Sequence, residues 1–404
     1  MNKINLYKPH QSKNRVLILT SLTILASSLV LPFQQAFAAT LTTLVNFNGT
    51  NGSTPRAGVV KGAGTDNNLY GTTSAGGTSG NGTAFKLVPT AYNPPITLIN
   101  FTGTSGTYKG TNPVARLFQA ADGNFYGSTF TGGTSNLGTV FKLILANNNF
   151  TTLVNFTGTG GINPGANPAG RLIADKTDPK ILWGTSSTGG VNNKGTVFKV
   201  PTSGGPLTTV VNFNGTNGAT PLARLQLATD GNYYATTSTG GTGNKGVVFK
   251  VTQGGILTSY SFSSNGANGA NPQSGLIESS GFLYGTAKLG GANNKGAIFK
   301  VPLGGGTPVL VASFNGTNGA NPTAALIKAS NGNFYGTASA GGANNKGVIY
   351  QLTGGTITGL ISFNGTNNGA TPESTLIQLS NGDFYGTASF GGTSDKGTVF
   401  KFVP

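Results

Sequence analysis

The chain contains no cysteine, and its single histidine and single methionine, His10 and Met1, lie within the first ten residues. Without cysteine it forms no disulfides and offers no thiolate chemistry. Beyond residue 10 no imidazole remains to act as a general base, to complete a Ser-His-Asp triad or to bind a transition metal. These absences exclude most hydrolase mechanisms and favour a non-enzymatic protein with no catalytic residue, no cofactor and no metal.

Charge is also scarce, since charged residues make up 8% of the chain, with 25 Lys and Arg against nine Asp and Glu. Four basic residues lie in the first 38 positions, so the remaining 21 outweigh the nine acids and leave a net charge of about +12. A sparse basic surface favours acidic partners, such as an anionic polysaccharide or a cell-surface component. Nucleic acid is not an expected partner, because Lys and Arg form no clusters.

The one long apolar run lies at the N-terminus. Lys3, Lys8, Lys13 and Arg15 precede an uncharged run over 16–33, and Ala36-Phe37-Ala38 follows it. Positive charge, an apolar core and a small-x-small motif are the parts of a cleaved signal peptide. The alternative, an uncleaved membrane anchor, fits less well because Ser, Thr and Pro interrupt the run. We predict a signal peptide over 1–38, no later membrane span, and export to the periplasm or the extracellular space.

Glycine is abundant, at 66 residues, and it recurs in register rather than in collagen triplets. An aromatic followed by Gly-Thr or a close variant occurs seven times, with Gly-Gly six residues later and a second aromatic fifteen residues later. The first aromatics are Tyr70, Tyr126, Trp183, Tyr234, Tyr284, Tyr335 and Tyr385. The offset within a copy is constant while the spacing between copies varies, so each copy is one supersecondary unit.

Each copy predicts four short strands. Examples are "PLARLQLA" (221–228), "NFYGTAS" (333–339) after an Asn-Gly hairpin turn, "KGTVFKV" (194–200) and "PVLVASF" (308–314). Four antiparallel strands in about 50 residues are typical of a β-propeller blade. Residues 41–47 read as a fourth strand without its first three, and the chain stops after a third strand. We therefore predict an all-β, seven-bladed propeller over 39–404, whose N-terminal strand completes the last blade and closes the ring.

The motif "GNFYGTASAGGANNKGVIY" (332–350) and its six siblings resemble the GloVer tandem repeat of exported bacterial proteins. The resemblance covers about residues 40 to 404 and implies a propeller-like fold and export. Many proteins of this kind carry a C-terminal anchor, and because none follows Val403-Pro404 we expect a free protein. The family has no established activity, so the resemblance implies no function.

The acidic residues are expected to be structural. Asp66, Asp122 and Asp230 each lie four residues before a blade aromatic, where turn carboxylates accept bonds from backbone amides. Glu278 and Glu373 could act as a glycosidase pair only if they met at the central axis, and we do not expect this. No calcium-binding loop motif is present.

Lysines form two rows. The first row directly follows the third-strand aromatic: Lys86, Lys142, Lys199, Lys250, Lys300 and Lys401. The second row directly precedes the glycine that begins that strand: Lys194, Lys245, Lys295, Lys346 and Lys396. We interpret both as solvated strand positions, with a ring of positive charge for an anionic polymer as the alternative.

Arginines are less evenly distributed. Arg116, Arg171 and Arg224 lie three residues after a proline in blades two, three and four, where blades five to seven have Gly275, Ala325 and Thr375. If this strand is innermost, the three guanidiniums meet on one side of the channel mouth. Their geometry suits carboxylate, sulfate or phosphate, so we predict a ligand-binding site. The alternative is that they cap backbone carbonyls of the linkers.

These features predict an exported, monomeric, non-enzymatic propeller that binds a glycan or an anionic surface partner, with repeated weak sites adding through avidity. Tyr92, Tyr108 and Phe390 are candidates for stacking on sugar. One alternative is a polysaccharide lyase or sialidase-like hydrolase that uses the arginine cluster, although no Ser-x-Asp-x-Gly-x-Thr-Trp box is present. A structural envelope or matrix protein is the third possibility.

Overall fold

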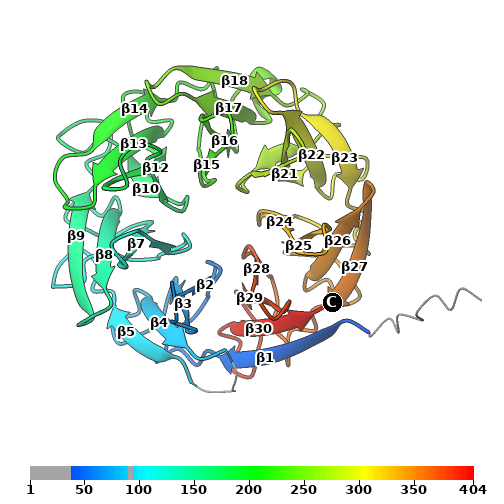
Figure 1. Ribbon diagram of the computed structural model, residues 1–404, viewed down its shortest axis with the longest axis horizontal. Helices are drawn as coiled ribbons and strands as arrows, with labels where there is room; N and C mark the ends of the chain where they lie inside the picture. The colour runs from blue at the N-terminus through cyan, green and yellow to red at the C-terminus, as the bar shows by residue number, and fades with distance from the viewer. Residues whose placement is uncertain (1–37, 90–93) are drawn as a thin grey trace, which may run out of the picture. The chain divides into compact units, whose positions relative to one another are not determined.

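The computed structural model describes residues 38–89 and 94–404, so the predicted signal peptide and Tyr92 lie outside the described residues. Residues 38–404 form one compact unit of seven antiparallel sheets arranged in a ring (Figure 1). This confirms the predicted seven-bladed β-propeller. Within the described ranges, no helix is both long and apolar enough to cross a membrane.

The strands of blades one to three follow one another along the chain. Blade one contains β2 (Val60–Lys61), β3 (Leu69–Thr73), β4 (Thr83–Leu87) and β5 (Ile96–Asn100). Blade two contains β6 (Phe118–Gln119), β7 (Phe125–Thr129), β8 (Thr139–Ile144) and β9 (Asn149–Asn155). Blade three contains β10 (Ala166–Pro168), β11 (Ile173–Ala174), β12 (Ile181–Thr188), β13 (Thr196–Pro201) and β14 (Thr208–Asn212).

Blades four to six repeat this order. Blade four contains β15 (Gln226–Leu227), β16 (Tyr233–Thr237), the 3-10 turn η1 (Thr242–Asn244), β17 (Val247–Val251) and β18 (Leu257–Ser261). Blade five contains β19 (Ala270–Pro272), β20 (Ile277–Ser279), β21 (Phe282–Leu289), β22 (Ala297–Pro302) and β23 (Val309–Ser313). Blade six contains β24 (Ile327–Lys328), β25 (Phe334–Ala338), β26 (Val348–Thr353) and β27 (Thr356–Ser362).

Blade seven is built from both ends of the described chain. It contains β28 (Ile377–Gln378), β29 (Phe384–Ala388), β30 (Thr398–Val403) and, as its outer strand, β1 (Thr40–Asn46). β1 pairs antiparallel with β30, from Thr40 opposite Val403 to Asn46 opposite Thr398. Figure 1 shows the blue strand beside the red one. The predicted ring closure is confirmed, and β30 is paired on both sides rather than left as an open edge.

The innermost strand of each blade is shorter than the sequence predicts. In blade four it covers only Gln226–Leu227 rather than 221–228. Pro221 has no N–H to donate to a ladder, and Thr220 before it has a φ of 56°. The first part of the segment therefore runs along the axis without pairing. The other three strands agree with the prediction to within a few residues.

The blade aromatics pack between neighbouring blades, as predicted. Ring centroids lie 4.6 Å apart for Tyr70 and Phe125, and Trp183 stacks on Tyr233 at 4.2 Å. Six of the seven are buried. Tyr284 is the exception: it is half-buried beside Phe334, and Ser280 replaces the turn Asp or Asn that approaches the hydroxyl in blades one, two, four and six.

In six of the seven blades a glycine follows the aromatic and makes room for the ring of the third strand, whereas blade four has Ala235 there. A Cβ placed on Gly127 would lie 2.5 Å from Cζ of Phe141, and one on Gly285 would lie 2.6 Å from Cζ of Phe299. Both phenylalanines are fully buried. The repeated Tyr-Gly-Thr motif is therefore a packing requirement of the blade rather than a catalytic loop.

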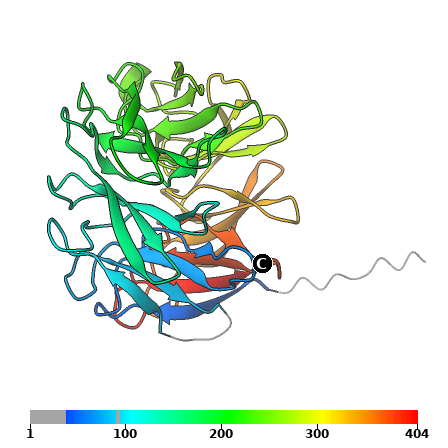
Figure 2. The same cartoon turned by 60° about the vertical axis from the view of Figure 1, so that its left-hand side comes forward.

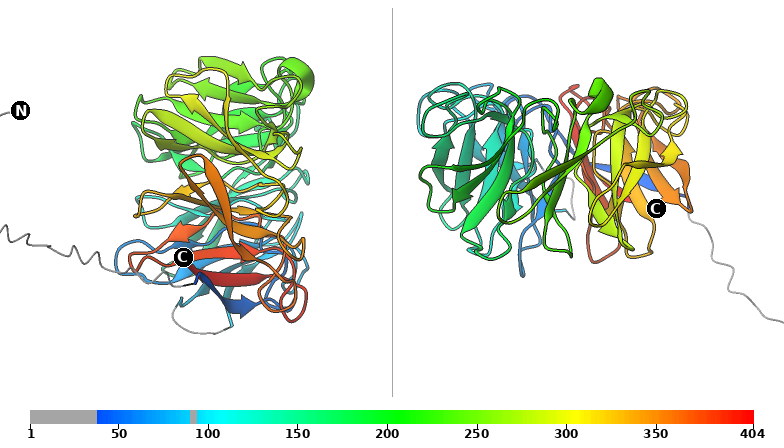
Figure 3. Two further views of the ribbon diagram at one scale, coloured as in Figure 1. Left: turned by 90° about the vertical axis from the view of Figure 1, so that its right-hand side faces the viewer. Right: turned by 90° about the horizontal axis from the view of Figure 1, so that it is seen from above.

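Loops gather on two faces of the ring, as the side and oblique views show (Figures 2 and 3). The face that we name the linker face holds the links between blades and the loops from second to third strands. In blade two these segments join through a backbone bond from Thr111 N–H to the carbonyl of Thr131, at 2.9 Å. The opposite face, which we name the hairpin face, holds the first-to-second and third-to-fourth turns.

Candidate ligand pocket

A pocket of about 460 Å³ lies where the seven innermost segments meet. Its wall consists mainly of the three residues that follow the proline of each blade, for example Val114, Ala115 and Arg116 in blade two. Because these residues come directly after the links between blades, the pocket belongs to the linker face. Sevenfold repetition thus builds one axial site whose wall varies from blade to blade.

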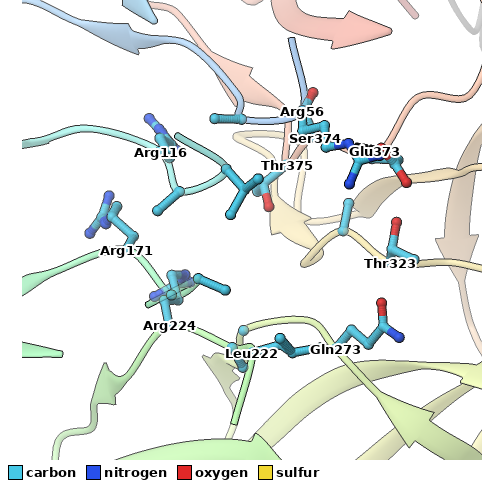
Figure 4. Close-up of a pocket in the computed structure, with 18 of the residues that line it drawn as sticks. Arg56, Arg116, Arg171, Leu222, Arg224, Gln273, Thr323, Glu373, Ser374 and Thr375 are labelled. Carbon is cyan, nitrogen blue, oxygen red and sulfur yellow. Dashed lines mark ion pairs between the residues drawn. The ribbon is translucent and has the colours of Figure 1, made fainter. Parts of the chain in front are cut away.

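The structure brings the three predicted arginines together in this pocket. Arg116, Arg171 and Arg224 come from successive blades and lie along one side, while Gln273, Thr323 and Glu373 lie opposite (Figure 4). The pocket therefore has a cationic side and a polar side.

None of these three guanidiniums has an acidic partner among the described residues, and two of them also have an unpaired Nε. The Nε atoms of Arg116 and Arg171 are buried without a hydrogen-bond partner among the described residues. The Arg171 guanidinium lies 5.5 Å from the centroid of the Phe118 ring. Burial, followed by repulsion from Arg171 and Arg224, lowers the pKa of Arg116, and burial also lowers that of Arg171. Two half-buried cations on one side of a pocket repel each other, and a bound anion would relieve this repulsion.

Arg224 behaves differently from the other two. Its Nη1 donates to Oε1 of Gln226 at 2.8 Å, and its Nη2 donates to the carbonyl of Leu276 in the next blade at 3.0 Å. Gly275 accommodates this side chain, because a Cβ there would lie 2.6 Å from Cγ of Arg224. The carbonyl-capping alternative therefore holds for Arg224, which supports the wall of the site.

Sequence reasoning missed Arg56, which follows Pro55 directly and also lines the pocket. Its Nε lies 3.7 Å from Oε2 of Glu373, which also accepts a bond from Ser389 Oγ at 2.8 Å. The signal was the position immediately after the proline, where blade one has Arg and blade seven has Glu. Comparing only the third position after each proline concealed this pair.

The turn aspartates have the structural role predicted for them. Asp122 accepts the backbone N–H of Asn124 at 3.1 Å, the Tyr126 hydroxyl at 2.7 Å and Lys142 Nζ at 3.0 Å. Burial acts to raise the pKa of Asp122, but bonds from Asn124, Tyr126 and Lys142 together hold it well below its ordinary value. The hairpin-turn carboxylate thus holds the hydroxyl of the blade tyrosine.

The structure does not bring Glu278 and Glu373 together as a carboxylate pair. Glu278 accepts a bond from Thr229 N–H in the neighbouring blade at 2.9 Å and does not line the axial pocket. No tyrosine lines that pocket either, and no group of three His, Cys, Asp or Glu suited to a metal occurs within the described ranges.

The other candidates have mixed surroundings. Lys142, Lys199 and Lys401 lie within 4 Å of an aspartate, so part of the first lysine row is paired rather than solvated. Tyr108 packs edge-on against Phe150, whereas Phe390 is 41% exposed on the linker face. Of the described aromatic candidates for sugar stacking, only Phe390 is exposed.

The fold and pocket define this protein as a seven-bladed β-propeller with an axial, arginine-lined site. The family model of the Gloeobacter/Verrucomicrobia repeat matches residues 105–268 and 227–404, so the chain belongs to that repeat family, as its motif predicts. No curated protein matches the chain.

Similar solved structures include a proposed 6-phosphogluconolactonase from Bacteroides uniformis. It is 15% identical over 80% of this chain and 88% of its own, with a TM-score of 0.52. A proposed 6-phosphogluconolactonase from Bacteroides fragilis is 16% identical over 83% of this chain and 97% of its own, with a TM-score of 0.48. At 15% identity the likeness to the Bacteroides uniformis protein shows the fold alone.

Proposed function

We propose that this protein is an exported, non-enzymatic propeller that binds an acidic glycan, with one carboxylate, sulfate or phosphate of the glycan held by Arg116 and Arg171. The supporting observation is that both half-buried arginines line the axial pocket, each with an unpartnered Nε and without an ion pair among the described residues. The planar donor geometry of arginine matches an oxyanion, and a bound anion would remove the repulsion between them.

The polar side of the pocket suits the remainder of a sugar. Gln273 and Thr323 offer hydrogen bonds to hydroxyl groups, and Val114 and Leu222 offer apolar contact. Ligand sites commonly combine such a surface with a few well-placed charges. Glu373 is the one acid that lines the pocket, and its ion pair with Arg56 and the hydrogen bond that it accepts from Ser389 make it a wall residue rather than a free acid or base.

Calorimetric titration with trigalacturonate tests the proposal, with its neutral methyl ester as the matched ligand. Arg116→Thr and Arg171→Thr are suitable variants because Thr375 occupies the same position in blade seven. A charge-assisted bond contributes about 1.5–3 kcal/mol, so each variant should weaken binding at least about tenfold. Lys86→Gln, which copies Gln351 of blade six, makes the same change of charge on the hairpin face and should have no effect.

Equal binding of the acid and its ester, or equal loss in the Lys86→Gln control, would contradict the proposal. The lyase or hydrolase alternative makes a separate prediction, namely that the trisaccharide is cleaved during prolonged incubation. Binding without cleavage, lost in both arginine variants, is the outcome that we expect.

A further inference from the structure

The charges of the described residues are divided unequally between the two faces. Eleven basic and two acidic residues belong to the linker face, whereas ten basic and seven acidic residues belong to the hairpin face. The division follows from the hairpin turns, which hold six of the nine acids: Asp66, Asp122, Asp175, Asp178, Asp230 and Asp383. About three quarters of the excess positive charge therefore lies on the face that contains the pocket.

Five of the linker-face cations form a regular rim. They occupy the same position in blades three to seven, at the end of the loop from second to third strand: Lys194, Lys245, Lys295, Lys346 and Lys396. All but the half-buried Lys245 are exposed, and none forms an ion pair among the described residues. Asp395, the one acid beside this rim, uses Oδ1 to accept the N–H of Gly391 at 2.8 Å.

The rim lysines are held by folded loops. In blade three Asn193 Oδ1 accepts the N–H of Gly189 at 2.9 Å, and in blade five Asn294 Oδ1 accepts that of Gly290 at 3.0 Å. The backbone carbonyl of each rim lysine from blades three to six accepts a bond from the start of the next blade, for example from Thr220 N–H to Lys194 at 3.0 Å. Each of blades three to seven thus presents its rim lysine from the same place around the pocket.

We propose that the linker face binds a long acidic polysaccharide, whose chain lies across the lysine rim while one of its anionic groups occupies the arginine pocket. This inference rests on the proposed function and extends it from a single group to a polymer. Binding of a polymer gains from each additional charge contact, because every neutralised anionic group releases counterions, as it does for other linear polyanions.

Several features favour a polysaccharide over a nucleic acid or a membrane. The rim carries one lysine in each of blades three to seven, which suits a polymer with well-separated charges better than a duplex with one charge per ~1.7 Å. Exposed Phe390 lies on the linker face of blade seven, where its backbone pairs with that of Ala370, and it offers a ring for a sugar. The predicted export places the protein where such polymers occur.

The test compares polygalacturonate of about 30 sugars with trigalacturonate, each titrated into two matched variants of the full chain. The rim variant carries Lys194→Gln, Lys295→Gln and Lys346→Gln, and the control variant carries Lys86→Gln, Lys250→Gln and Lys300→Gln on the hairpin face. We expect the rim variant to bind the polymer at least tenfold more weakly, with a shallower salt dependence, and to bind the trisaccharide within twofold of the unaltered protein. The control variant should match the unaltered protein with both ligands.

Unchanged polymer binding in the rim variant, or equal losses in both variants, would overturn the inference. So would rim-dependent binding of duplex DNA or of anionic phosphatidylglycerol vesicles that is tighter than polymer binding. Binding of trigalacturonate to the unaltered protein and to Arg116→Thr separates this inference from the proposed function. If neither protein binds the trisaccharide but both show rim-dependent polymer binding, the pocket proposal fails while the rim remains a polymer surface.

Discussion

At the residue scale, the repeated motif is explained by packing and by turn chemistry. Tyr126 is buried between blades, its hydroxyl is held by Asp122, and Gly127 leaves space for Phe141. Differences between copies are therefore natural substitution experiments, since the same position is occupied by different residues in an equivalent environment. Two of them lead to predictions.

Tyr350 is the one tyrosine at a position where six blades have phenylalanine. Its hydroxyl is buried without a hydrogen-bond partner among the described residues. Tyr350→Phe should raise the free energy of unfolding by about 1–3 kcal/mol, because it removes an unsatisfied polar group and keeps the ring. Denaturant titration measures this, with Phe299→Tyr as the reverse change in blade five. A marked loss of stability in Tyr350→Phe would show that the hydroxyl has a partner.

Asp122→Asn tests the turn carboxylate through its pH dependence. Because the pKa of Asp122 is held below its ordinary value, its contribution is present near neutral pH and is lost as the pH falls below about 4. Asn331, the equivalent residue in blade six, donates from Nδ2 to the Tyr335 hydroxyl at 2.9 Å, so an amide is tolerated at this position and the variant should fold. We expect it to be about 1 kcal/mol less stable at pH 7, with the difference narrowing at pH 2.5. A difference that stays constant between these pH values would contradict this account.

At the element scale, a strand from each blade supplies one aromatic to the following interface. Tyr335 contacts Phe384 of blade seven, with centroids 4.8 Å apart, and is buried. Its half-buried equivalent in blade five, Tyr284, contacts Phe334 in the same way. The loss of stability when this aromatic is removed should therefore be larger where the ring is more buried.

Tyr335→Ala should destabilise the protein by about 3–5 kcal/mol, because it leaves a cavity between two blades. Tyr284→Ala is the matched variant and should cost clearly less, since part of the ring already contacts solvent. Thermal or urea unfolding of both proteins measures the difference. Equal losses would mean that the aromatic acts mainly within its own blade.

The second, third and fourth strands of each blade could be predicted because the motif residues recur at constant offsets. The ends of the innermost strand could not be predicted. Its hydrogen bonding depends on the prolines and on the positive φ of residues such as Thr220, and the sequence pattern does not show this. Likewise, the spacing placed three arginines on equivalent strands but could not show that Arg224 bonds to Leu276 O. Contacts between blades depend on the closed ring, which no single repeat contains.

At the scale of the whole molecule, repetition provides the ring and deviation from repetition provides the pocket. Blades two to four supply arginine where blades five to seven supply small or polar residues, so the axis acquires one cationic side. The acids lie mainly in the turns of the opposite face. The charge of the linker face thus follows from the placement of turn aspartates as much as from that of the cations.

The most direct test of this account is anomalous diffraction from crystals soaked in selenate, which matches sulfate in shape and charge. Bound anion should give its strongest peak in the axial pocket beside the guanidinium groups of Arg116 and Arg171, and Arg171→Thr crystals should lose that peak. An empty axial pocket, with selenate only at surface lysines, would contradict the assignment of these arginines to a ligand.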